Sequence, residues 1–188
     1  MSEMLETLPT GLSREAYYTW AEAQPRGRFE LVDGAVIAMA PERVAHARAK
    51  GRAWRLLGDA LAAAKLPCEA LPDGVTVEVG DATAYEPDVV VVCGERVDGN
   101  AFAAPSPLII VEVTSPSNSR ADMTTKATDY LRLPSLRHYL IIHLAKRVVL
   151  HHRKLEDGRI ETAILGGGDL VLDPPGIRVS VEALLAEA

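Results

Sequence analysis

Two carboxylates, Asp88 and Glu112, are each placed in an apolar run of the chain. Asp88 opens the run Asp88-Val89-Val90-Val91-Val92, and Glu112 lies within Leu108-Ile109-Ile110-Val111-Glu112-Val113. Both runs are rich in Val and Ile and predict buried strands. A carboxylate in such a strand is costly unless a partner or a metal compensates its charge. Two of them on consecutive strands predict one shared site, which would hold Mg²⁺ or Mn²⁺.

Lys126 is the candidate cation of this site. The turn after Glu112 reverses the chain, so we expect the first turns of the next helix to lie near the end of the Glu112 strand. There Lys126 would position a nucleophilic water and stabilise the charged transition state of phosphodiester hydrolysis. The alternative is an exposed salt bridge with Asp122, which lies four residues earlier on the same helix face.

Two further side chains are candidate accessory groups. Glu30, between Phe29 and Leu31, is either a third carboxylate of the site or an outward-facing strand residue. His46, early in a predicted helix, either contacts a phosphate or a carboxylate or is a surface or packing residue. Glu86 lies beside the Asp88 strand and is left outside the predicted site.

The net charge of −6 argues weakly against a nucleic-acid partner, but the charge is unevenly spread. One predicted helix carries a basic cluster of Arg43, Arg48, Lys50, Arg52 and Arg55. Within it, Arg48, Arg52 and Arg55 are candidate contacts to the phosphates of a nucleic acid, expected to be DNA. The alternative is an ordinary solvated face of an amphipathic helix.

The remaining composition limits the class of protein. The 188 residues suit one domain spanning residues 1–188. No apolar stretch approaches the roughly 20 residues of a membrane span, and the N-terminus lacks a secretory pattern. Cys68 and Cys93 have no metal-binding spacing, so we expect a cytoplasmic chain with small, buried, reduced thiols.

A helix-flanked mixed sheet must position these groups, an α/β (α+β) architecture. Asp33-Gly34 between two apolar runs predicts an N-terminal β-hairpin. We expect the central strands at residues 75–79, at the Asp88 and Glu112 runs, and at 137–143. A second hairpin, added at the C-terminal side, is expected at 146–153 and 159–165. The expected helices span residues 13–23, 43–65, 121–131 and 179–186, and residues 1–11 are expected to be loose.

Several motifs occur in the order of a known family. They are Phe29-Glu30-Leu31-Val32-Asp33-Gly34, Pro87-Asp88-Val89, Val111-Glu112-Val113-Thr114-Ser115-Pro116-Ser117, and Asp122 followed four residues later by Lys126. From about residue 13 to 185 the chain resembles the Uma-two family of restriction-endonuclease-like proteins, within the PD-(D/E)XK nuclease superfamily.

The resemblance implies a restriction-endonuclease-like fold and Mg²⁺- or Mn²⁺-dependent cleavage of DNA. Its metal ligands fall on Asp88 and Glu112. The superfamily's lysine position falls on Thr114, so the resemblance points to Lys126 as a displaced equivalent. Homodimers are common among such nucleases. Some members of the superfamily keep the fold and lose cleavage, which leaves open a nucleic-acid-binding or protein-interaction module. A third alternative for the function is a metal-dependent phosphoesterase that acts on a small substrate.

Overall fold

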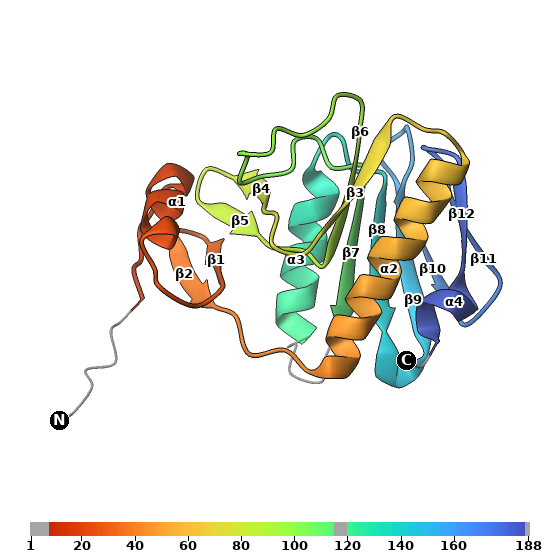
Figure 1. Ribbon diagram of the computed structural model, residues 1–188, viewed down its shortest axis with the longest axis horizontal. Helices are drawn as coiled ribbons and strands as arrows, with labels where there is room; N and C mark the ends of the chain where they lie inside the picture. Colours follow the sequence, from red (N-terminus) through yellow and green to blue (C-terminus); the bar gives the residue numbers. More distant parts are fainter. Residues whose placement is uncertain (1–7, 115–119, 187–188) are drawn as a thin grey trace.

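A mixed α/β architecture is seen in the computed structural model, which describes residues 8–114 and 120–186 but not the side chains of residues 120–122. A six-stranded sheet forms the centre, and a four-stranded sheet and a two-stranded sheet pack beside it (Figure 1). Among the described residues, no helix is long and apolar enough to cross a membrane.

The central sheet is antiparallel except for one parallel pair, β7 with β8, which α3 (Arg120–Arg132) connects. A helical crossover is the usual way to join parallel neighbours. In spatial order the strands are β10 (Ile160–Leu165), β9 (Val148–Lys154), β8 (His138–His143), β7 (Ile109–Thr114), β6 (Val89–Cys93) and β3 (Cys68–Pro72).

The central sheet separates two hydrophobic cores. On one face, α2 (Val44–Ala63) packs with alternate strand residues such as Val89 and Val111. The other face carries Val90 and Ile110, which pack against Tyr130 of α3. This alternation is the two-residue period of strands buried on both faces. Polar side chains at the end of β7 and the start of β6 can therefore be reached by helices from both faces.

The predicted N-terminal hairpin is confirmed. It pairs β1 (Phe29–Val32) with β2 (Ala35–Ala38), and Asp33 and Gly34 adopt the positive φ angles, 48° and 79°, that a tight hairpin turn requires. Helix α1 (Arg14–Glu22) precedes it, capped by the Ser13 hydroxyl, which accepts from the Ala16 N–H. The hairpin is not isolated, because β5 (Thr83–Tyr85) and β4 (Val77–Gly80) extend it to four strands.

One of the strands expected in the central sheet lies in another sheet. The strand expected at residues 75–79 corresponds to β4, which belongs to the smaller sheet. The neighbour of β6 at the edge of the central sheet is β3, which was not predicted and which pairs Pro72 with Val89 and Cys68 with Cys93. Strand β3 is short and ends on a proline, and proline is tolerated there because β3 is an edge strand.

The C-terminal part was predicted in part. The hairpin of β9 and β10 is confirmed, but it continues the central sheet and is not an addition to it. The hairpin of β11 (Asp169–Leu172) and β12 (Ile177–Ser180) was not predicted. It uses residues assigned to the start of the final helix, so α4 (Val181–Leu185) begins later, capped by the Ser180 hydroxyl.

The expectation of reduced, buried thiols is wrong for this structure. Cys68 and Cys93 form a disulfide between directly opposed residues of β3 and β6, with their Cα atoms 3.9 Å apart. Cys93 is also exposed. Because β3 was not predicted, the sequence offered no sign that these two residues face each other.

Two buried histidines make the stability of the fold dependent on pH. His138 Nδ1 lies 2.9 Å from His151 Nε2, and burial lowers the pKa of each ring to about 4. The unfolded chain therefore binds more protons between about pH 6.5 and 4, and stability should fall as the pH falls through this window. In His151→Gln, we expect the slope of unfolding free energy against pH to decrease by about 1.4 kcal/mol per pH unit.

Urea unfolding between pH 4.5 and 6.5 measures these slopes. The slopes of wild type and His151→Gln should converge above pH 7, where both rings are neutral in either state. Identical slopes in the two proteins at the lower pH values would contradict this explanation.

Candidate metal and active site

The pairing of β6 with β7 brings Asp88 and Glu112 to the same place. The ladder pairs Val89 with Val111, so continuing it by one residue sets Asp88 opposite Glu112. The Asp88 N–H donates to the Val111 carbonyl (3.1 Å), and Asp88 Oδ2 accepts from the Val113 N–H (2.5 Å). Both side chains are buried, with 5% and 7% exposed. Side chains at opposed positions point to one face of a sheet and are close neighbours.

Helix α3 returns along the sheet and adds Lys126 and Tyr130, one turn apart. Lys126 Nζ donates to Glu30 Oε1 (2.7 Å) and lies 3.7 Å from Glu112 Oε1. The Tyr130 hydroxyl donates to the same oxygen of Glu112 (3.1 Å). Lys126 is therefore a buried part of this cluster. The Asp122 side chain, its other expected partner, lies outside the described residues, as do Ser115 and Ser117.

Glu30 points into the site and not outward. It comes from β1 of the smaller sheet and is 7% exposed. Its Oε1 also accepts from the backbone N–H of Glu86 (2.9 Å). Glu86 itself pairs with Arg28, whose guanidinium bridges to Asp73 (2.8 Å to each carboxylate). Glu86, which was not predicted to belong to the site, therefore borders it.

The start of α2 brings a second group of side chains to Asp88. The His46 ring nitrogens face the Glu42 carboxylate and the Val113 carbonyl oxygen, and Nε2 lies 3.7 Å from Asp88 Oδ2. One ligand atom each from Glu42, His46 and Asp88 lie within 4.8 Å of one another. Lys50, one turn further along, contacts Glu42, Asp73 and Asp88. Sequence reasoning missed Glu42 and Lys50, although residues 42, 46 and 50 have the four-residue spacing of one helix face.

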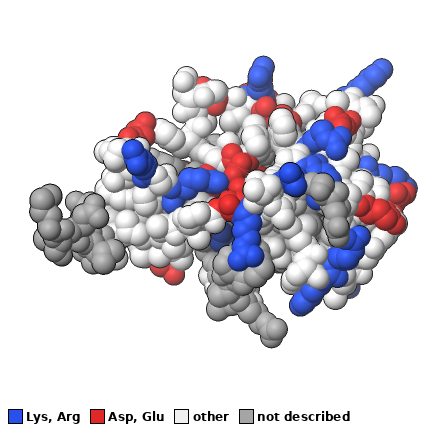
Figure 2. Space-filling model, turned by 60° about the horizontal axis from the view of Figure 1, so that its bottom comes forward, with Lys and Arg blue, Asp and Glu red and all other residues white. Residues whose placement is uncertain are grey.

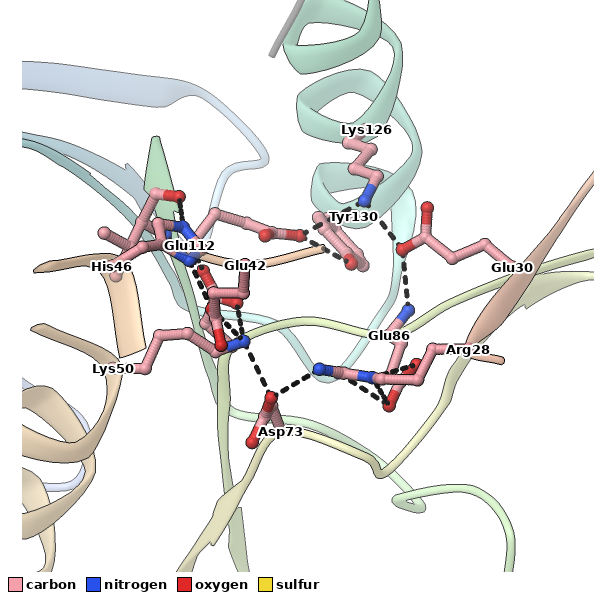
Figure 3. A network of polar contacts seen from close by, with 12 residues as sticks. Arg28, Glu30, Glu42, His46, Lys50, Asp73, Glu86, Glu112, Lys126 and Tyr130 are labelled. Atoms are coloured by element: carbon pink, nitrogen blue, oxygen red, sulfur yellow. Dashed lines mark hydrogen bonds and ion pairs between the residues drawn. The ribbon is translucent and has the colours of Figure 1, made fainter. Parts of the chain in front are cut away.

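These contacts form one continuous polar network (Figure 3). It runs from Lys50 through Asp73, Arg28 and Glu86 to Glu30, and then through Lys126 to Glu112. Six carboxylates face three cations in it. The carboxylates belong to Glu30, Glu42, Asp73, Glu86, Asp88 and Glu112, and the cations to Arg28, Lys50 and Lys126. The network therefore has an excess of negative charge. Figure 2 shows acidic side chains gathered near the middle of the face where α2 begins, with Lys and Arg side chains beside them.

Burial changes the protonation of this network. Burial, assisted by the charges of Asp88 and Glu30 and opposed by Lys126, raises the pKa of Glu112 to about 8. The pKa of Lys50 is raised despite burial, because the charge of Asp88 and the hydrogen bonds to Asp73 and Glu42 outweigh the loss of hydration. Near neutral pH, Lys50 is thus charged, and the Glu112 carboxyl binds its proton more tightly than an ordinary glutamate does until a further cation compensates its charge.

The donor set fits a divalent cation. Carboxylate oxygens suit Mg²⁺ and Mn²⁺, and an imidazole nitrogen suits the transition metals more than Mg²⁺. Asp88 with Glu42 and His46 could hold such an ion, and Glu112 lies on the same side of the sheet. The excess negative charge and the raised pKa of Glu112 both indicate a site short of positive charge.

The three candidate phosphate contacts on α2 lie away from the carboxylates. With about 3.6 residues per helical turn, Arg48, Arg52 and Arg55 fall on the side opposite His46 and Lys50. Arg48 and Arg52 line a pocket of about 570 Å³, together with Arg147 and apolar residues including Leu144 and Leu185. Arg55 instead pairs with Asp59 (3.6 Å).

Known proteins resemble the chain over most of its length. The Uma2 family model, described as "Putative restriction endonuclease", matches residues 14–186. Two uncharacterized proteins of Synechocystis sp. (strain PCC 6803) are similar to it. The protein slr1290 is 29% identical over 148 residues (78% of this chain, 76% of that protein), and sll1609 is 27% identical over 157 residues (82% and 88%).

A solved structure gives the same fold. The crystal structure of "a putative nuclease belonging to DUF820" from Anabaena variabilis ATCC 29413 matches with a TM-score of 0.73 at 15% identity, covering 93% of this chain and 97% of that one. The expected restriction-endonuclease-like fold is thereby confirmed. Since the family model spans nearly all of the described residues, the chain belongs to the Uma2 family.

Proposed function

We propose that this protein is a divalent-metal-dependent endonuclease that hydrolyses phosphodiester bonds of DNA. The observation that supports it most is the buried cluster of Asp88, Glu112 and Lys126, with Lys126 Nζ 3.7 Å from Glu112. Two carboxylates and an ammonium are what metal-assisted phosphodiester hydrolysis needs. Membership of the Uma2 family, described as "Putative restriction endonuclease", points to the same chemistry.

Each residue has a distinct part in this proposal. Asp88 and Glu112 would hold Mg²⁺ or Mn²⁺, with Glu42 and His46 as further ligands on the α2 side. The bound cation supplies Lewis-acid stabilisation of charge on the phosphate oxygens. Lys126, held by Glu30, places its ammonium next to the same charge and orients the attacking water. In the reaction, the water oxygen bonds to phosphorus and releases a proton to solvent, the bond from phosphorus to one sugar oxygen breaks, and that oxygen takes up a proton from solvent.

The direct test is a cleavage assay on supercoiled plasmid, linear duplex, single-stranded DNA and RNA, with Mg²⁺, Mn²⁺ or EDTA. We expect nicking or linearisation of DNA that depends on the metal and stops with EDTA. A purified, folded protein that cleaves none of these substrates with either metal would overturn the proposal.

Thr114 supports a second candidate function, a nuclease-fold module that binds nucleic acid or protein without cleaving. The superfamily's lysine position carries Thr114, whose hydroxyl donates to the Ile142 carbonyl (3.4 Å) and cannot replace an ammonium. In that case, the protein would slow the migration of DNA in a mobility-shift assay and would leave the DNA uncleaved in the presence of Mn²⁺.

We further propose that the arginine-lined pocket beside α2 contacts the phosphate backbone. In EDTA, Arg48→Gln/Arg52→Gln should bind a DNA duplex more weakly than wild type, because two cations are removed. The slope of log affinity against log salt should become less steep by about 0.9 for each phosphate group that the variant no longer neutralises. Arg159→Gln is the matched control, since Arg159 is exposed on a distant hairpin. Equal affinities and slopes in the two variants would show that this pocket does not contact the phosphate backbone.

A further inference from the structure

Lys50 contacts three carboxylates of the network. Its ammonium lies 2.7 Å from Asp73 Oδ2, 2.8 Å from Glu42 Oε1 and 3.0 Å from Asp88 Oδ1. The residue is 6% exposed. A lysine ammonium has three N–H donors, which equals the number of carboxylates in contact with it.

This ammonium occupies the kind of place that a metal ion would take. Glu42 and Asp88 are its partners, and both also belong to the group that could hold a cation. A divalent ion bound by the same carboxylates would lie within a few ångströms of the ammonium. At that separation the two positive charges repel each other, and the repulsion is strengthened because the ammonium is largely removed from water.

A space for the displaced ammonium lies beside it. A pocket of about 150 Å³ is lined by Lys50 and its partners Glu42, Asp73 and Asp88, and it extends to Gly51, Trp54 and Pro72. Trp54 is 43% exposed, so the pocket borders solvent. Asp73 is also held by Arg28 and does not belong to the Glu42, His46 and Asp88 group. It can keep its contact with Lys50 when the other two carboxylates are taken.

We propose that Lys50 is a built-in counter-cation of the metal site, and that a divalent ion must displace its ammonium from Glu42 and Asp88 to bind. This inference rests on the proposed metal site. In the metal-free protein, Lys50 holds the carboxylates together and prevents their mutual repulsion. The same contacts weaken metal binding, because the ion competes with a resident charge.

Calorimetric titration with Mn²⁺ tests this directly. Lys50→Met keeps the apolar stem and removes the charge, so we expect Mn²⁺ to bind at least about ten-fold more tightly than to wild type. Arg28→Gln is the matched control. It removes a positive charge from the same network, but its contacts are to Asp73 and Glu86, and it should change the affinity much less. Equal or weaker Mn²⁺ binding by Lys50→Met would overturn the proposal.

A second measurement uses wild-type protein and does not depend on the folding of a variant. An amine-acylating reagent followed by mass spectrometry reports the accessibility of each lysine. Labelling of Lys50 should be slow without metal and should rise on saturation with Mn²⁺, whereas labelling of exposed Lys146 should not change. A Lys50 that stays protected in Mn²⁺-saturated protein would overturn the displacement.

The outcomes also separate this inference from the proposed function. If wild type and Lys50→Met bind Mn²⁺ equally, the metal site stands and the role of Lys50 falls. If neither binds Mn²⁺, both proposals fall. If only Lys50→Met binds Mn²⁺, the role of Lys50 as a competing cation is supported, and the proposed metal-dependent activity of the wild-type protein is contradicted.

Discussion

The Asp88→Asn and Glu112→Gln variants are expected to lose metal-dependent DNA cleavage by more than about a hundred-fold, since even the outer partners of metal ligands cost up to that much when replaced. Both substitutions keep the shape of the side chain and remove its charge. Asp88→Asn retains an oxygen that can accept from the Val113 N–H, so the start of β6 should stay in place.

Plasmid cleavage with Mn²⁺, measured beside thermal unfolding, checks this expectation. Asp157→Asn is the matched control, because Asp157 is an exposed carboxylate that contacts only Arg159 in its own turn. The control should cleave like wild type. Undiminished cleavage by folded Asp88→Asn and Glu112→Gln would show that chemistry occurs elsewhere.

The second large effect is expected from Lys126→Met. The variant leaves Glu30 and Glu112 buried without their cation, and breaking a buried pair in this way typically costs about 3–5 kcal/mol of stability. Cleavage should also fall by about 10²–10³-fold if the ammonium stabilises the charged transition state. Urea unfolding and cleavage rates measure the two effects separately.

A double variant separates the structural role of Lys126 from its chemical one. In Lys126→Met/Glu30→Gln, the direct partner of the lysine is also neutral, so much of the missing stability should return. Cleavage should stay low, because the ammonium is still absent. Recovery of both stability and cleavage in the double variant would mean that Lys126 only supports the fold.

The strand pattern predicted the centre of the site better than its surroundings. Asp88 and Glu112 could be recognised because an acidic residue next to or within a run of Val and Ile is costly without compensation. Strand β1 has only four residues, too few to predict to which face the Glu30 side chain points. That face was decided by the packing of the smaller sheet against α3.

Lys50 shows why the rest could not be predicted. In the sequence it is one basic residue among several on α2, and a solvated face was the ordinary alternative. Its burial depends on Asp73, which follows the unpredicted strand β3, and on Asp88 from β6. Such contacts appear only when the sheet is assembled. The disulfide of Cys68 and Cys93 was missed for the same reason.

Calorimetric titration of the wild-type protein with Mn²⁺ at neutral pH, repeated on Asp88→Asn, shows whether these carboxylates form a metal site. A site built from Asp88, Glu112 and their α2 neighbours predicts saturable Mn²⁺ binding by wild type that Asp88→Asn loses. Wild-type protein that binds no Mn²⁺, or an Asp88→Asn variant that binds it as tightly as wild type, would contradict the account.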